Sequence, residues 1–202
     1  MKYSTSLSPE QVIEHVVDME MWHGRVWVNH EKRIYFVPIW RNANTQFMYL
    51  AEQFGFTLDL HPDVDNYIGF AFVRHPYNRI AGQYWRAMEN NGWTADYVTE
   101  QLQSGTVADP HFETQASFLQ PYNISYFINL DDPRPVDNAL IQSIIKEVNA
   151  QKSNRISSLE NNSVVDYLIS NSELQEHIEN YFRDDFDMFL KLFPDTHKLK
   201  WN

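Results

Sequence analysis

The chain has 202 residues, of which 43% are apolar and 15% aromatic, so it can bury enough surface to exclude a mainly disordered state. Its formal net charge of −11 argues against non-specific nucleic-acid binding, which depends on Lys and Arg neutralising phosphates. The absence of cysteine excludes disulfides, thiolate catalysis and thiolate zinc sites. We expect one domain over residues 1–202 that is soluble, cytoplasmic and not membrane-bound, because the sequence shows neither a signal-peptide core nor the ~20 apolar residues that span a bilayer.

The N-terminal part predicts a helix over about residues 9–23. Ser8 suits the N-cap position and Pro9 the first helical position, and an apolar stripe follows. After Gly24, β-branched and aromatic residues predict strands over 25–28 and 33–40, and the second is the better candidate for a buried central strand.

The next segment has helical spacing from Thr45 to Phe54, and Gly55 suits a left-handed helix end. A short strand is expected over 56–60. Residues 67–73 are almost continuously apolar, which predicts a strand buried on both faces, as in a parallel sheet.

The second half of the chain is predicted to be mainly helical. We expect helices over 77–90, 94–103 and 135–149, a strand over 125–130, loops over 104–111 and 150–162, and a C-terminal helical segment over about 163–193. Because strands alternate with helices, the chain is expected to form an α/β fold with a mostly parallel sheet flanked by helices.

The exit of the strand at 33–40 is a candidate anion site. A loop that leaves a strand and enters a helix presents backbone N–H groups and the positive helix end to a phosphate, and Asn44, Thr45 and Gln46 are placed to use them. The pattern G-x-x-x-x-G-K-[ST] is absent, which argues against an ATPase of that class or a small kinase. An ordinary polar connection is the alternative interpretation of this segment.

The exit of the strand at 67–73 carries two arginines, Arg74 and Arg79, in the pattern Arg-x-Pro-x-x-Arg. An arginine at the end of a buried strand can deliver a fixed guanidinium to an anionic ligand at the carboxyl edge of a sheet. The alternatives are that Arg74 pairs with a carboxylate at a helix start and that Arg79 supports the fold through a nearby carboxylate.

This second segment resembles the one with which sulfotransferases bind the 3′-phosphate of 3′-phosphoadenosine 5′-phosphosulfate (PAPS), and Arg41-Asn-Ala-Asn-Thr45 is similar to their 5′-phosphosulfate loop. The resemblance, to the carbohydrate-type branch, implies a P-loop-NTPase-like sulfotransferase fold and PAPS as sulfuryl donor, with no metal. The cofactor-binding residues that it implies here are Arg41, Asn42, Ala43, Asn44, Thr45, Gln46, Arg74, Arg79, Gly82, Lys152, Ser153 and Arg155.

The chain departs from the family at two functional positions. Arg41 stands where the family has its catalytic lysine, and arginine is a poor proton donor because its pKa exceeds ~12. Gly82 stands where the family has a serine, eight residues after the first arginine, so that a backbone N–H, Gln83 or Arg79 would have to replace the hydroxyl.

Two further stretches extend the resemblance. Residues 109–119 are similar to the His-Trp-x-x-Gln stretch of carbohydrate sulfotransferases, and they make His111 the candidate base that takes the acceptor proton. Residues 148–155 resemble the polar loop that closes over the nucleotide. Residues 178–189 look like the family's closing Tyr-x-x-Asp-x-x-x-Phe helix, whose aromatic spacing indicates packing.

The expected function is therefore sulfuryl transfer from PAPS to a hydroxyl of a carbohydrate or similar acceptor, with Arg41 and His111 as the catalytic residues. A non-catalytic nucleotide-binding or interaction protein with a degenerate sulfotransferase fold remains the alternative, because both departures lie at functional positions. The sequence leaves the acceptor and the oligomeric state open.

Overall fold

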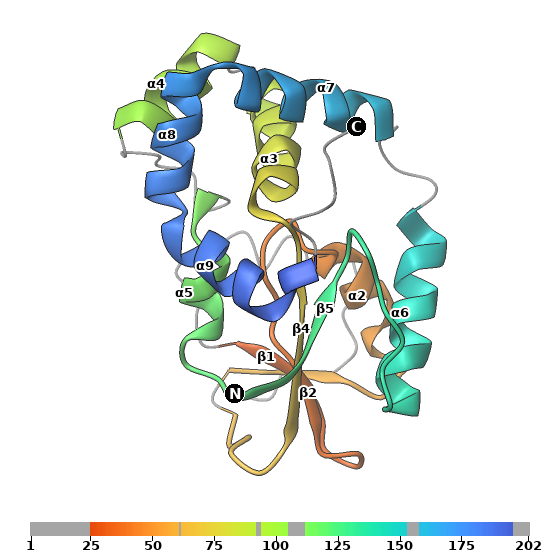
Figure 1. Ribbon diagram of the computed structural model, residues 1–202. Coiled ribbons are helices and arrows are strands. Elements are labelled where there is room, and N and C mark those ends of the chain that lie inside the picture. The colour runs from red at the N-terminus through yellow and green to blue at the C-terminus, as the bar shows by residue number, and fades with distance from the viewer. Residues whose placement is uncertain (1–24, 61, 92–93, 105–111, 153–157, 196–202) are drawn as a thin grey trace. The chain divides into compact units, whose positions relative to one another are not determined.

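The computed structural model describes residues 25–60, 62–91, 94–104, 112–152 and 158–195 (Figure 1). The helix expected over 9–23 lies outside these residues, as does most of the loop expected over 104–111. The described residues fall into two compact units. One takes in residues up to Val73 and from Ser117 to Arg155, and it is called the sheet unit here; the other takes in Arg74–Ala116 and the residues from Ile156 on, and it is called the helical unit.

The sheet unit contains five strands in the order β3-β1-β2-β4-β5. Their bounds are Val26–Asn29 for β1, Ile34–Phe36 for β2, Thr57–Asp59 for β3, Ile68–Val73 for β4 and Ile124–Asn129 for β5. β2, β4 and β5 are parallel neighbours, whereas β1 is antiparallel to both β2 and β3. The α/β prediction is thus confirmed, and the sheet is mixed, with its parallel part in β2, β4 and β5.

The antiparallel pair β1–β2 forms because its connection is a tight turn. The side chain of Asn29 accepts a hydrogen bond from the backbone N–H of Lys32 at 2.8 Å, and Arg33 has a φ of 52°. Asn tolerates such turns because its side chain can bond backbone groups nearby. A connection this short can join only antiparallel strands, since a parallel pair needs a longer crossover.

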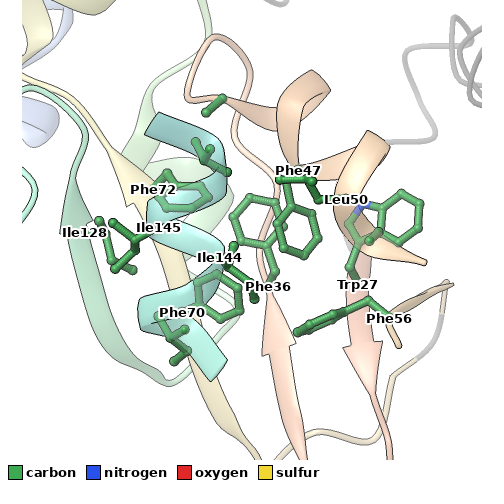
Figure 2. Close-up of a cluster of buried hydrophobic side chains, with 14 of the residues drawn as sticks. Trp27, Phe36, Phe47, Leu50, Phe56, Phe70, Phe72, Ile128, Ile144 and Ile145 are labelled. Carbon is green, nitrogen blue, oxygen red and sulfur yellow. The ribbon is translucent and has the colours of Figure 1, made fainter. Parts of the chain in front are cut away.

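Helices α2 (Asn44–Ala51) and α6 (Ala139–Lys152) belong to the same unit and contribute to its apolar cluster with the sheet. Figure 2 shows Phe36 and Phe47 in the middle of this cluster, with Phe70 and Phe72 on one side of them. The rings of Phe36 and Phe47 have centroids 4.0 Å apart, and Phe36 also contacts the rings of Phe70 and Phe72. Such aromatic pairs contribute about 0.5–1.5 kcal/mol each beyond the burial of their area.

β4 is buried from Gly69 to Val73, which confirms the prediction of a strand covered on both faces. Gly69 lies against the ring of Tyr35 on β2, whose hydroxyl donates a hydrogen bond to the carbonyl of Asn123 at 2.6 Å. A Cβ at residue 69 would stand 2.5 Å from that ring and 2.7 Å from the same carbonyl oxygen. Only glycine fits there, and Tyr35 and Gly69 together fix the pairing of β2 with β4.

The helical unit contains α3 (Pro76–Asn91), α4 (Ala95–Ser104), α7 (Ser158–Ser170), α8 (Ser172–Tyr181) and α9 (Arg183–Leu192). A short helix that the sequence did not predict, α5 (Gln115–Leu119), contains the boundary between the units. The apolar side chains of α3, α4, α7 and α8 contribute to a second cluster, which includes the fully buried Ile80, Leu168 and Ile178.

Several helix boundaries differ from the sequence prediction, including the end of α2 at Ala51. α6 begins at Ala139 because the side chain of Asn138 accepts hydrogen bonds from the N–H groups of Leu140 and Ile141, which is the arrangement of an N-cap. The loop expected over 150–162 is helical up to Lys152 and again from Ser158. Gly55 has a φ of 71°, as expected for a left-handed helix end.

Candidate functional site

The turn between β2 and α2 contains most of the residues assigned to the 5′-phosphosulfate group. Arg41 has a φ of 68° and Ala43 has a φ of 58°, so two non-glycine residues lie in the left-handed region within one turn. This region is uncommon for residues with a Cβ. Turns that contain left-handed residues can direct successive N–H groups toward one point, which is how anion-binding concavities are built.

The start of α2 has backbone donors for such an anion. Ala43 occupies the N-cap position and supplies no capping side chain, and the first turn of α2 contains no acidic residue. The backbone hydrogen bonds of this turn run from Asn42 to Ile39 and from Phe47 to Ala43. Because the first N–H groups of an α-helix have no partner within the helix, the start of α2 presents backbone donors at residues 44–46.

Two asparagines in this turn are buried, and Asn42 ties the turn to the sheet. The Asn42 side chain is fully buried and donates a hydrogen bond to the carbonyl of Phe72 on β4 at 3.0 Å, which ties the turn to the neighbouring parallel strand. Asn44 is 6% exposed, and its Oδ1 has no hydrogen-bond partner within the described part of the chain. The turn is therefore anchored to the sheet through Asn42.

Arg74 is the first residue of the helical unit and directly follows β4. Its backbone is held by Gln115, which is fully buried. The N–H of Arg74 donates to Oε1 of Gln115 at 3.0 Å, and Nε2 of Gln115 donates to the carbonyl of Arg74 at 3.0 Å. One side-chain amide thus satisfies both backbone groups of this residue, as a neighbouring strand would do.

Arg79 lies on the first turns of α3 and is 0% exposed. Its guanidinium donates to the carbonyl of Glu113 and lies beside the buried carboxylate of Asp185 on α9, with 3.7 Å between Nη1 and Oδ2. Asp185 also accepts the N–H of Ala116 at 2.9 Å. This geometry favours the alternative in which Arg79 supports the fold through a carboxylate.

Burial and charge act in opposite directions on this pair. Burial lowers the pKa of Arg79 to about 10, against the attraction of Asp185, and the nearby charge of Arg74 lowers it further. Burial raises the pKa of Asp185, opposed by the charge of Arg79 and by hydrogen bonds from Gln115 and Ala116. Gln115 therefore connects the backbone of Arg74 with the ion pair behind it.

Gly82 and Gln83 lie on α3 and are both buried. Gln83 is 2% exposed, and neither its Oε1 nor its Nε2 has a hydrogen-bond partner among the described residues. Because the Gln83 side chain is enclosed, it is not exposed to a ligand and cannot take the place of the serine hydroxyl that is missing at Gly82. His75, between Arg74 and Pro76, accepts the N–H of Tyr77 at 3.3 Å and so caps the start of α3.

Three of the predicted site residues, His111, Ser153 and Arg155, lie outside the described residues, and Lys152 is the last residue of α6. The structure groups residues 41–46 in one turn of the sheet unit, and it places Arg74, Arg79 and Gly82 on one segment of the helical unit.

Sequence reasoning did not recognise Asp185 as a partner of Arg79 or Gln115 as a partner of Arg74. A signal for Asp185 exists in the sequence. It stands between Phe182 and Phe189 at helical spacing, and a carboxylate within an apolar stripe indicates a buried cation beside it.

Within the described residues, no group of three or more His, Asp or Glu side chains is arranged to hold a metal ion. In the same part of the chain, every helix is too short or too polar to cross a bilayer. Comparisons of the chain with protein-family models, with curated proteins and with solved structures found no match.

Proposed function

We propose that this protein is a sulfotransferase that uses PAPS to sulfate a hydroxyl of a carbohydrate or similar acceptor, on a P-loop-NTPase-like sulfotransferase fold. The observation that carries the proposal is the turn between β2 and α2. Its left-handed residues Arg41 and Ala43, followed by a helix start without a side-chain cap, have the backbone geometry that phosphate sites use in other proteins, which supports the proposal.

The order of the strands supports the same assignment. β2 and β4 are adjacent and parallel, so the turn after β2 and the end of β4 at Val73 lie at the same edge of the sheet. Ligands of open α/β sheets bind outside the carboxyl ends of the strands. The Asn42 hydrogen bond to Phe72 joins these two strand ends directly.

In this proposal the N–H groups of residues 44–46 bind the 5′-phosphate, Arg41 offsets charge on the sulfuryl and bridging oxygens, and Arg74 binds the 3′-phosphate. Arg79 supports the backbone of Arg74 through Asp185 and Gln115. His111 would take the acceptor proton during direct in-line transfer. Positioning and charge stabilisation supply most of the acceleration in such a mechanism.

Calorimetric titration with three nucleotides tests cofactor binding. We expect 3′-phosphoadenosine 5′-phosphate to bind more tightly than adenosine 5′-phosphate, by about tenfold or more, because a hydrogen bond to a charged group contributes about 1.5–3 kcal/mol. ATP lacks the 3′-phosphate, so its affinity should not show the same increase over that of adenosine 5′-phosphate. Absence of binding by all three nucleotides would exclude both the enzyme and a nucleotide-binding relative without activity.

Arg41→Lys tests catalysis separately, with the exposed Arg134→Lys as the matched control. Radiolabelled sulfate transfer to a panel of sugars by the parent chain would support the enzyme with arginine in place of lysine. Transfer by Arg41→Lys but not by the parent chain would identify the parent as the non-catalytic form. The lysine ammonium can donate a proton during the reaction, whereas the arginine guanidinium is a poor proton donor.

A further inference from the structure

The backbone of Arg74 is held more firmly than its position at a strand end requires. β4 ends at Val73, whose carbonyl still accepts the N–H of Leu130 at 2.9 Å. One residue later the partner is the side chain of Gln115, which bonds both the N–H and the carbonyl of Arg74. Backbone groups in a strand-to-helix connection pair with other backbone, with side chains or with water, and here a single buried side chain serves both groups.

Gln115 is itself held in place by burial and by hydrogen bonds to Asp185. It is 0% exposed, and its own hydrogen bonds to Asp185 lower the pKa of that carboxyl. Asp185 in turn pairs with the buried Arg79 and accepts the N–H of Ala116. The amide is thus a link in a buried chain of polar contacts, from Arg74 through Gln115 and Asp185 to Arg79.

We propose that Gln115 is a positioning residue for anion binding by Arg74, and that it sets the preference for a nucleotide carrying a 3′-phosphate. This inference depends on the proposed function for the identity of the anion. Its physical basis is preorganisation. A backbone pinned by two hydrogen bonds restricts where the guanidinium can reach, so less conformational entropy is lost when the anion binds.

The charges around Arg74 explain why its backbone needs these hydrogen bonds. Arg74 is close enough to Arg79 for its charge to lower the pKa of Arg79, so the two cations repel each other. Asp185 compensates mainly the buried Arg79. Without Gln115, repulsion from Arg79 would favour positions of Arg74 farther from the buried pair, and the site for a doubly charged phosphate would lose its fixed geometry.

The test compares the affinities of 3′-phosphoadenosine 5′-phosphate and adenosine 5′-phosphate in the whole chain, for the parent, for Gln115→Met and for the exposed control Gln120→Met. In Gln115→Met, which keeps the length of the side chain and removes both hydrogen bonds to the backbone of Arg74 together with the side-chain bond to Asp185, we expect the preference for the bisphosphate to fall about 10-fold or more. The affinity for the monophosphate should stay within about twofold, and the control should match the parent.

Gln115→Glu provides a second test if Gln115→Met does not fold. Its carboxylate can accept from the N–H of Arg74 and cannot donate to the carbonyl, whereas the protonated carboxyl can do both. We therefore expect the preference to be low at pH 8 and to recover as the pH falls toward 5, relative to the parent measured in parallel. A purely structural role would not produce this recovery.

The outcomes separate the two proposals. If the parent prefers the bisphosphate and folded Gln115→Met keeps that preference, or weakens for both nucleotides equally, the role of Gln115 is overturned and the proposed function stands. The role of Gln115 is likewise overturned if Gln115→Glu shows no recovery at low pH. If the parent has no preference for the bisphosphate, both proposals are overturned.

Discussion

The two units of the molecule use different interactions to hold their helices. In the sheet unit, α2 and α6 contribute to a cluster of aromatic and aliphatic side chains that includes Phe36, Phe47 and Ile144. In the helical unit, α3 and α9 are also joined by a buried ion pair, Arg79 with Asp185, and Gln83 is enclosed with no hydrogen-bond partner among the described residues. Removing atoms from an apolar cluster lowers the free energy of unfolding in proportion to the burial lost and the cavity left. A buried charge that loses its partner instead keeps its full desolvation cost.

The largest effect should come from the ion pair. Asp185→Asn leaves the guanidinium of Arg79 buried without a compensating charge, and we expect a loss of about 3–5 kcal/mol in the free energy of unfolding. Urea denaturation followed by circular dichroism measures it. The neighbouring Asp184→Asn is the control, because Asp184 is exposed, and it should change little. A loss below about 1 kcal/mol for Asp185→Asn would show that the pair is hydrated.

A cavity in the sheet unit should cost slightly less. Ile144 is 0% exposed on α6, and Ile144→Ala should lower the free energy of unfolding by about 2–5 kcal/mol, through lost burial and a partly collapsed cavity. Ser143→Ala, on the exposed side of the same helix, is the comparison. Hydrogen exchange should show the loss of protection mainly in β2, β4 and α6. An equal loss throughout α3, α8 and α9 would mean that the two units unfold as one.

Gln83→Met should stabilise the protein. The substitution keeps the length of the side chain and removes two buried polar atoms that lack partners among the described residues, each of which costs about 1–3 kcal/mol. We expect a gain of about 1–2 kcal/mol, visible as a higher denaturation midpoint. A loss of stability would show that the amide is satisfied in solution by water or by another part of the chain.

A further effect concerns alkaline pH and the buried tyrosines of the helical unit. Burial raises the pKa of Tyr84 to about 12, and burial with a hydrogen bond to Glu179 raises that of Tyr77 as well. The folded state then keeps protons that the unfolded state releases above pH ~10, so stability falls as the pH rises from ~10 to the folded pKa, by up to ~1.4 kcal/mol per pH unit and tyrosine.

Tyr84→Phe checks this expectation. The variant should lose stability less steeply between pH ~10 and ~11.5 than the parent, whatever its stability at neutral pH. Tyr49→Phe is the control, because Tyr49 is 40% exposed. Equal slopes for the parent and Tyr84→Phe would contradict burial of the Tyr84 hydroxyl.

Much of the secondary structure could be predicted from the sequence, because apolar periodicity and turn residues act locally. β4, α3 and β5 each lie within one residue of their predicted bounds at both ends. The antiparallel direction of β1 could not be predicted, because strand pairing depends on partners distant in the sequence. The side chain of Asn29 closes the turn after β1, and a polar loop of that composition is compatible with other connections.

The arginines of the candidate site could be predicted from the sequence, whereas the residues that hold them in place could not. The pattern Arg-x-Pro-x-x-Arg identified Arg74 and Arg79 without showing that one of them is enclosed. Gln115 stands 41 residues from Arg74 in the sequence, and the His-Trp-x-x-Gln comparison includes it without showing that its side chain bonds the backbone of Arg74. Arg79 and Asp185 are even farther apart, so only the fold brings their charges together.

Gly69 gives β4 a fixed reference point. Since Tyr35 and the Asn123 carbonyl leave no room for a Cβ, β4 can pair with β2 in one register alone. A slip by one residue would turn Phe70 and Phe72 to the opposite face and shift the end of β4 by about 3.3 Å along the sheet. Tolerance of the carboxyl edge of the sheet to mutation is therefore decided partly at the other end of β4, where an added methyl group would displace the residues that lead to that edge.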